Sequence, residues 1–267
     1  AELDVPHDGM QFLLKHPDSY QAYLGSRPKE WEDRAIDMLI ELTKEFRHHI
    51  HVVHISSAQS IASISEAQKK GYQITTETCP HYLCFNAENI PDQATVFKCA
   101  PPIREKENNE QLWQAIQEQI IDFIVTDHSP SPPAMKSLES GSFEEAWGGI
   151  AGLQFSLPSI WSEASKRGMS VEDIARLMSL NVAKFLKLDH KKGKLNPGYD
   201  ADLVVWDPEE CFEVEEENIY HRHKLTPFMG LTLNGMVKQT YVNGNKVYDQ
   251  GIFSSPKGSI VLKSRNE

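Results

Sequence analysis

Short apolar runs rich in β-branched residues alternate with amphipathic helical segments along the first half of the chain, and this order constrains the fold more than any other feature. The strand-like runs are "IHVVHI" (50–55), "YQITTE" (72–77) and "IDFIVT" (121–126). The helical segments that precede them are residues 30–49, 56–71 and 109–119. A strand, helix, strand order predicts parallel strands joined by right-handed crossovers, so we expect an α/β fold.

The character of the sequence changes after about residue 190. The stretch "GKLNPGYDADLVVWDP" (193–208) predicts a strand between two turns. Further on, "QTYVNGNKVYDQG" (239–251) places Asn-Gly between two β-rich runs, which is a strong hairpin signal. We therefore predict an α/β domain over residues 1–190 and a small all-β domain over residues 191–267.

Charge and cysteine usage exclude several classes of partner. The formal net charge is -11, and no basic stripe is present, so we do not expect nucleic acid binding, which requires clustered Lys and Arg. The apolar runs are short and interrupted, so we expect no membrane association. Four irregularly spaced cysteines suit a reducing compartment better than a disulfide framework. We expect an intracellular, cytoplasmic protein, with organellar targeting left open.

Three polar residues occupy equivalent places along the chain. His54 ends the first strand-like run, His81 follows the second, and Asp127 follows the third. The carboxyl ends of parallel strands in a βα barrel converge on one mouth, so these residues can meet in space. Two imidazoles and a carboxylate make a plausible zinc ligand set, and an aspartate beside metal-bound water can shuttle its proton.

Other interpretations of these residues stay open. A single histidine at a strand end is often a structural residue, although three such residues on successive units weaken that interpretation. Cys79, His81 and Cys84 form a C-x-H-x-x-C that could nucleate a structural zinc site, but no second ligand pair with the required spacing follows. The glycine-rich "GGIAG" (148–152) lacks the context of a dinucleotide fingerprint and predicts a close-packed or substrate-approaching backbone.

Seven motifs carry a resemblance to a known family. They are "VVHISS", "ETCPHYL", "CAPPIRE", "TDHSP", "GGIAGLQ", "NVAKFLKL" and "GKLNPGYDADLVVWD". From about Ser26 almost to the C-terminus, the chain resembles the cyclic amidase branch of the amidohydrolase superfamily, which holds dihydroorotases, hydantoinases and allantoinases. "ETCPHYL", "CAPPIR" and "WGGIAGLQ" are most similar to the allantoinases. The resemblance implies a TIM-type (β/α)8 barrel, of which residues 1–190 would be the C-terminal half, and a β-sandwich, of which residues 191–267 would be the C-terminal part.

The resemblance also implies an activity and a set of site residues. The activity is metal-dependent hydrolysis of a small cyclic amide, with allantoin opened to allantoate in purine degradation. His54 and His81 would bind one zinc ion of a binuclear centre. Asp127 would bind the other and act as general base and then general acid. The segment Cys99 and Ala100, together with Asn181, would hold the cyclic amide largely through backbone groups.

The chain departs from the family pattern in one large respect. The His-x-His pair at the end of the first barrel strand and the carboxylated lysine that bridges the two metals cannot be placed in this sequence. Only three convincing barrel strands can be counted, against eight in a closed barrel. We expect a C-terminal fragment of a longer enzyme that is inactive alone, whereas the full-length parent would be an active homotetramer. Alternatives are a dihydropyrimidinase (hydantoinase), a dihydroorotase or a non-catalytic scaffold of the same fold.

Overall fold

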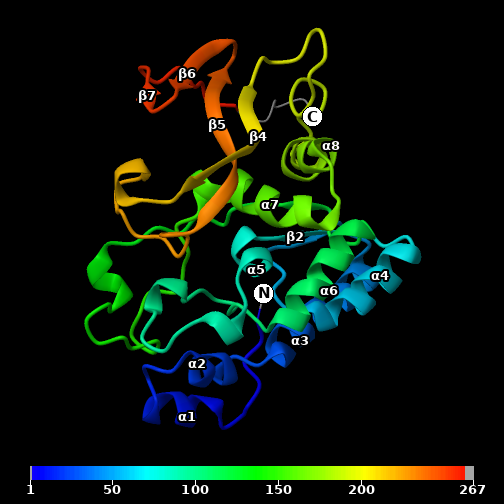
Figure 1. Ribbon diagram of the computed structural model, residues 1–267. Helices are drawn as coiled ribbons and strands as arrows, with labels where there is room; N and C mark the ends of the chain where they lie inside the picture. Colours follow the sequence, from blue (N-terminus) through cyan, green and yellow to red (C-terminus); the bar gives the residue numbers. More distant parts are fainter. Residues whose placement is uncertain (1, 262–267) are drawn as a thin grey trace.

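The computed structural model describes residues 2–261, and two sheets organise them (Figure 1). The parallel sheet contains β1 (Ile50–Val52), β2 (Ile74–Thr78) and β3 (Phe123–Ile124). The antiparallel sheet contains β4 (Leu203–Glu213), β5 (Thr232–Val242), β6 (Asn245–Asp249) and β7 (Ile252–Phe253). The α-helices are α1 (Gly9–Lys15), α2 (Tyr20–Ser26), α3 (Lys29–Phe46), α4 (Ile61–Lys69), α5 (Pro80–Cys84), α6 (Lys106–Gln117), α7 (Ser156–Ala164), α8 (Val171–Ala175) and α9 (Asn181–Phe185). None of the helices in the described part is long and apolar enough to cross a bilayer.

Shorter helical turns connect these elements. The 3-10 turns are η1 (Ala58–Ser60), η2 (Ala87–Asn89), η3 (Thr95–Phe97), η4 (Pro133–Lys136), η5 (Leu153–Phe155), η6 (Ser165–Arg167) and η8 (Glu216–Asn218). Helices α8 and α9 are joined by a π-helical turn, η7 (Arg176–Leu180). Ser170 caps this segment with a capping box, which explains why the helix begins at Val171.

The parallel order β1-β2-β3 confirms the predicted parallel strands. Helices α3, α4 and α6 lie side by side against the sheet (Figure 1). They bury apolar side chains such as Ile36, Ile64 and Leu112, which are 0% exposed. This burial is the main source of stability for short strands that have few ladder hydrogen bonds of their own.

A third parallel pairing lies outside the predicted strands. His128 and Ile150 form an isolated parallel bridge, and the amide of Ser129 donates to the carbonyl of Ile150 at 2.9 Å. The glycine-rich segment 148–152 was predicted to have a close-packed or substrate-approaching backbone, and Gly149 is close-packed. A Cβ on Gly149 would lie 2.4 Å from Ser129 Oγ, so only glycine fits at that position.

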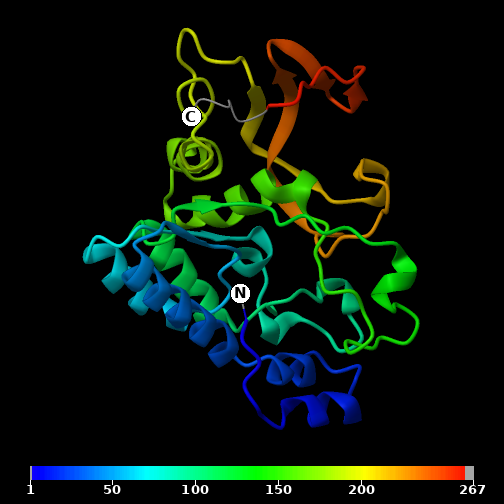
Figure 2. The same cartoon turned by 180° about the vertical axis from the view of Figure 1, so that it is seen from behind.

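The sequence did not predict α1 and α2, which lie at the end of the molecule opposite the antiparallel sheet (Figure 2). Two tyrosines of α2 fix this helix. Tyr20 Oη donates to the carbonyl of Ile103 at 2.8 Å, and Tyr23 Oη donates to the carbonyl of Cys99 at 2.6 Å. Both rings pack on Phe143, so α2 is attached to the loops beyond the parallel sheet.

The predicted hairpin around Asn243 and Gly244 is confirmed, since Val242 pairs with Asn245 between β5 and β6. Helix α7 lies between the two sheets (Figure 1). Trp161 Nε1 on α7 donates to the carbonyl of Pro208 at 2.9 Å, and the Trp161 ring lies edge-on against Trp206. The predicted boundary near residue 190 falls in the connection between α9 and β4.

Candidate active site

Backbone hydrogen bonds align the carboxyl ends of the three parallel strands. The amide of Ile55 donates to the carbonyl of Glu77 at 2.8 Å, and the amide of Val125 donates to the carbonyl of Thr78 at 3.1 Å. Thr78 Oγ1 also donates to the carbonyl of Ile55 at 2.7 Å. The segments that carry His54, His81 and Asp127 therefore leave the same edge of the sheet.

His54 and Asp127 both leave their strands in a left-handed backbone conformation, with φ of 42° and 41°. L-residues with a Cβ adopt this region at a cost, and such strain gathers at functional sites. The turn ends the strand and directs the side chain away from the ladder. His54 is half-buried and Asp127 is exposed, so the carboxylate is accessible from solvent.

His81 is the second residue of α5, directly after Pro80, which begins the helix. Its side chain is 2% exposed, and its Nε2 has no hydrogen-bond partner among the described residues. Burial lowers the pKa of His81 to about 3, and the positive charges of His54 and Lys136 act in the same direction. The imidazole is therefore neutral at pH 7 and offers a free lone pair.

His54 also carries a buried ring nitrogen, Nδ1, without a hydrogen-bond partner in the part of the chain that the structure describes, although the residue as a whole is less buried than His81. Burial lowers the pKa of His54, while the charge of Asp127 opposes that change. Buried polar atoms are nearly always paired, so two orphaned imidazole nitrogens at one sheet edge fit metal ligands.

The described residues do not by themselves form a complete metal centre. Among residues 2–261, no three His, Cys, Asp or Glu side chains come together as a group able to hold a metal ion. A structural zinc site at Cys79, His81 and Cys84 is not supported either. Burial raises the pKa of the Cys84 thiol to about 12, and its Sγ lies 3.5 Å from the carbonyl of Ser159, so it is a protonated thiol directed at α7.

A buried polar network holds the segment that follows His54. Glu32 on α3 is 1% exposed and accepts the amides of Ser56 at 2.7 Å and Ser57 at 3.0 Å. Arg104, 3% exposed, donates from Nε to Ser56 Oγ at 3.3 Å and from Nη1 to the carbonyl of Arg27 at 2.6 Å. This network could not be predicted from the sequence, because Glu32 lies in an ordinary amphipathic helix pattern.

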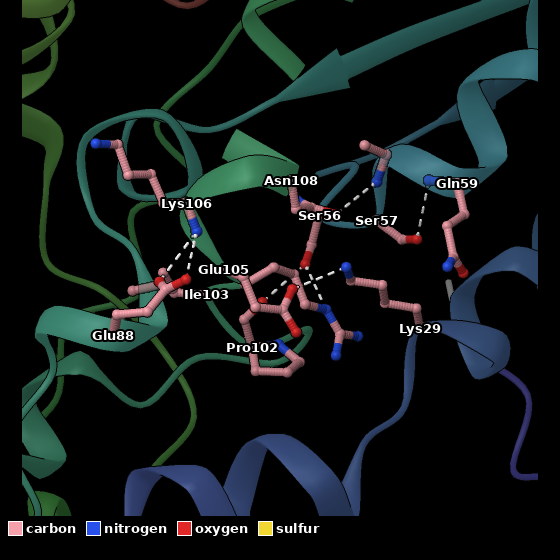
Figure 3. Close-up of polar contacts among 12 residues, drawn as sticks. Lys29, Ser56, Ser57, Gln59, Glu88, Pro102, Ile103, Glu105, Lys106 and Asn108 are labelled. Atoms are coloured by element: carbon pink, nitrogen blue, oxygen red, sulfur yellow. Dashed lines mark hydrogen bonds and ion pairs between the residues drawn. The ribbon is translucent and has the colours of Figure 1, made fainter. Parts of the chain in front are cut away.

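Ser56 is the central residue of the network (Figure 3). Its hydroxyl donates to the carbonyl of Pro102 at 2.7 Å, and Asn108 Nδ2 donates to its carbonyl at 2.8 Å. The amide of Ala58 donates in turn to Asn108 Oδ1 at 2.9 Å. The turn after β1 is therefore attached to the "CAPPIRE" segment and to α6, which fixes the backbone that carries His54.

The remaining predicted substrate residues fall in two places. Cys99 is buried and its carbonyl accepts the hydroxyl of Tyr23, whereas Ala100 is exposed. A Cβ on Gly148 would be in ordinary contact with Ala100, at 3.6 Å from its Cβ. Asn181 lies elsewhere: its Nδ2 donates at 2.7 Å to the carbonyl of Asp122, which precedes β3. Asn181 is therefore at the amino end of the sheet, and its position gives no support to a role in substrate binding.

Comparison with known proteins decides the family. The profile described as "Amidohydrolase family" matches residues 29–247 of this chain. The chain belongs to the amidohydrolase family. Within this family, the chain is 45% identical over 244 residues to an allantoinase from Streptomyces avermitilis, covering 91% of this chain and 54% of that protein. An allantoinase from Arabidopsis thaliana is 44% identical over 257 residues, covering 92% of this chain and 51% of that protein.

Solved structures agree with this amidohydrolase assignment. An L-hydantoinase from Arthrobacter aurescens superposes with a TM-score of 0.86 at 29% identity, covering 92% of this chain and 55% of that chain. A dihydropyrimidinase from Brevibacillus agri gives a TM-score of 0.85 at 28% identity, with 92% and 54% covered. The parallel sheet and its helices are thus part of a TIM-type barrel. The chain spans about half the length of the relatives it matches.

Proposed function

We propose that this chain is the C-terminal part of a metal-dependent cyclic amidohydrolase whose complete form opens allantoin to allantoate. Residues 1–190 would supply half of the barrel, and residues 191–267 would supply part of a β-sandwich. The observation that carries the proposal is the alignment of His54, His81 and Asp127 at one edge of the parallel sheet. The preference for allantoin rests on the 45% and 44% identity to the two allantoinases.

In this proposal, His54, His81 and Asp127 would hold zinc in a binuclear centre whose other ligands lie in the half of the relatives that this chain does not match. The bound metal would supply a Lewis acid that activates water and polarises an amide carbonyl. The neutral, orphaned nitrogens of His54 and His81 support this assignment. Asp127 is exposed at the strand end, so its carboxylate can take a proton from the attacking water and return it to the departing ring nitrogen.

The chain's own backbone would orient the substrate. Ala100 is exposed beside Gly148, so a flat ring could approach the segment there, whereas the carbonyl of Cys99 is already bonded to Tyr23. The network of Glu32, Ser56 and Arg104 would keep the turn after β1 in one geometry. We further propose a cytoplasmic homotetramer for the complete protein, which light scattering on the complete protein would test.

The experiment is a substrate panel on the complete protein, with any upstream coding sequence included. The panel contains allantoin, hydantoin, dihydrouracil and dihydroorotate, each tested with zinc, with chelator and in the D127N variant. We expect zinc-dependent opening of allantoin, and a loss of at least about 100-fold in kcat in D127N, because general acid-base catalysis contributes about that much. Zinc-independent turnover, or full activity in D127N, would contradict the proposal.

A hydantoinase or dihydropyrimidinase activity is the second candidate. The specific observation in its favour is the likeness in structure to an L-hydantoinase, with a TM-score of 0.86. Faster opening of hydantoin or dihydrouracil than of allantoin in the same panel would favour this candidate. A protein that binds zinc but opens none of the four compounds would be a scaffold that retains the fold.

A further inference from the structure

Lys136 is a buried cation beside the candidate active site. It ends η4, in the segment "SPSPPAMK", and only 4% of its surface is exposed. Its Nζ donates to the carbonyl of Lys98 at 2.9 Å, and the same carbonyl accepts the amide of Gly149 at 3.0 Å. The ammonium group of Lys136 therefore lies at Lys98, the residue that directly precedes the segment Cys99 and Ala100.

No carboxylate neutralises this ammonium group in the described part of the chain. Seven lysines pair with Asp or Glu, as Lys29 does with Glu105 at 2.8 Å, but Lys136 forms no such ion pair among the described residues. A lysine is rarely buried unless it is paired, because removing an ammonium group from water costs several kcal/mol. One neutral carbonyl satisfies one of its three donors, so two remain to bind another group.

The charges around Lys136 indicate what kind of group that is. No Asp or Glu of the described residues lies within ion-pair distance of its Nζ, which the carbonyl of Lys98 holds next to Cys99. Burial lowers the pKa of Lys136 to about 8, which leaves the side chain mainly protonated at pH 7. A buried cation without a counter-ion among residues 2–261, next to the Cys99 and Ala100 segment, fits an oxygen that carries negative charge.

We propose that Lys136 is a substrate-binding residue that recognises the negatively charged oxygen formed when the cyclic amide is opened. This inference rests on the proposed function. Opening an uncharged ring adds the oxygen of water to the carbonyl carbon and breaks the bond from that carbon to nitrogen. One proton of the water passes through Asp127 to the departing nitrogen and the other is released to solvent, which leaves a carboxylate. The ammonium group of Lys136 binds this carboxylate through a charge-assisted hydrogen bond, which the uncharged ring cannot form equally well.

The test compares binding of product and substrate in a background without turnover. The complete, zinc-loaded protein carries D127N, and calorimetry measures the Kd of allantoate and of allantoin. In D127N/K136M we expect allantoate to bind about 10- to 100-fold more weakly, the range for loss of one hydrogen bond to a charged group. We expect the Kd of allantoin to change less than about threefold, because the ring bears no charge.

Two further variants control for charge and for folding. K136R keeps the charge and is expected to retain most of the affinity for allantoate. K166M removes a lysine that pairs with Glu163 on the surface and is expected to change neither Kd. If K136M does not fold, judged by its unfolding midpoint, the pair K136R and K136Q gives the same comparison between a charged and an uncharged side chain.

The outcomes separate this inference from the proposed function. If the complete protein without substitutions does not open allantoin in the presence of zinc, the proposed function is wrong. If D127N binds both and removal of the Lys136 charge weakens both equally, or neither, then Lys136 only attaches η4 to Lys98 and the inference is overturned. Selective loss of allantoate affinity supports it.

Discussion

His54 and Asp127 share one backbone geometry although 73 positions separate them (127 minus 54): both follow a parallel strand, and both have φ near 40°, at 42° and 41°. Neither is a glycine, so each position carries strain that the rest of the fold must offset. A strand-end residue turned out of the ladder directs its side chain over the edge of the sheet. The strained turns thus direct two candidate metal ligands over the same edge of the sheet.

Because of this strain, we expect the usual order of stability of alanine and glycine variants to be reversed at these two positions. At His54 and at Asp127, we expect the Gly variant to be more stable than the Ala variant by about 1 kcal/mol, because only the Ala variant keeps the Cβ penalty. Val53 is the control, since its φ is not positive and its Ala variant should be the more stable. Chemical denaturation of the six variants measures the differences. Equal stability of Gly and Ala at both candidate sites would contradict the prediction.

The fold of the first half was largely predictable because strands and helices there follow hydrophobic periodicity. The strand-end positions of His54, His81 and Asp127 followed from the same pattern. The parallel contact at Ile150 was not predictable, because a glycine-rich sequence carries no strand signal.

The burial of two charged residues could not be predicted from the sequence, for a different reason. Glu32 belongs to an amphipathic helix in which an acidic residue is expected to face solvent, and Lys136 belongs to a proline-rich loop. Their burial depends on contacts with Ser56 and Lys98, which are distant in the sequence. Asn181 was expected near the substrate from the resemblance, but its hydrogen bond to Asp122 places it at the other end of the strand.

Glu32 should make stability depend on pH. Burial raises the pKa of its carboxyl from 4.5 to about 7, although Arg104 and the amides of Ser56 and Ser57 oppose the change. Between these values the folded state holds a proton that the unfolded state has lost, so the free energy of unfolding falls as pH rises from 4.5 to 7. The contribution lost is on the order of 3 kcal/mol.

The E32Q variant isolates this contribution, because an amide does not titrate. As pH rises from 4.5 to 7, we expect the free energy of unfolding of wild type to fall relative to that of E32Q. His81 titrates too, in the opposite sense, but it is common to both proteins and cancels. E30Q is the matched control, since Glu30 is an exposed neighbour on α3. A pH-independent difference for E32Q would show that Glu32 is ionised throughout.

Ser162 on α7 should contribute to the attachment of the antiparallel sheet. Its hydroxyl accepts the amide of Asn234 at 2.7 Å and donates to the carbonyl of Pro158 at 2.7 Å. S162A would leave that amide unpaired at a cost of about 1–3 kcal/mol. Ser159 is the control, because it is also buried but donates only within its own helix, to Ser156. Equal destabilisation in S159A and S162A, measured by thermal unfolding, would exclude the link to Asn234.

The chain of 267 residues, studied by itself, should associate and should lack appreciable hydrolase activity. Large apolar side chains are exposed at both ends of the molecule: Phe12 is 53% and Leu14 61% exposed on α1, and Ile252 is 74% and Phe253 56% exposed on β7. In the described part, β1 also pairs only with β2, so its other edge is open to a further strand. Exposed apolar surface and open edges promote self-association.

Light scattering over a range of protein concentrations would measure this association, and paired lysine substitutions would locate it. If the antiparallel sheet is the contact, I252K/F253K should lower the apparent mass and F12K/L14K should not, with the reverse for α1. Both pairs lie on exposed side chains, so neither should unfold the core. If neither pair changes the mass, the edge of β1 is the next contact to test, and supplying the half of the relatives that this chain does not match should cover it. A monomer at all concentrations with robust turnover would contradict the prediction.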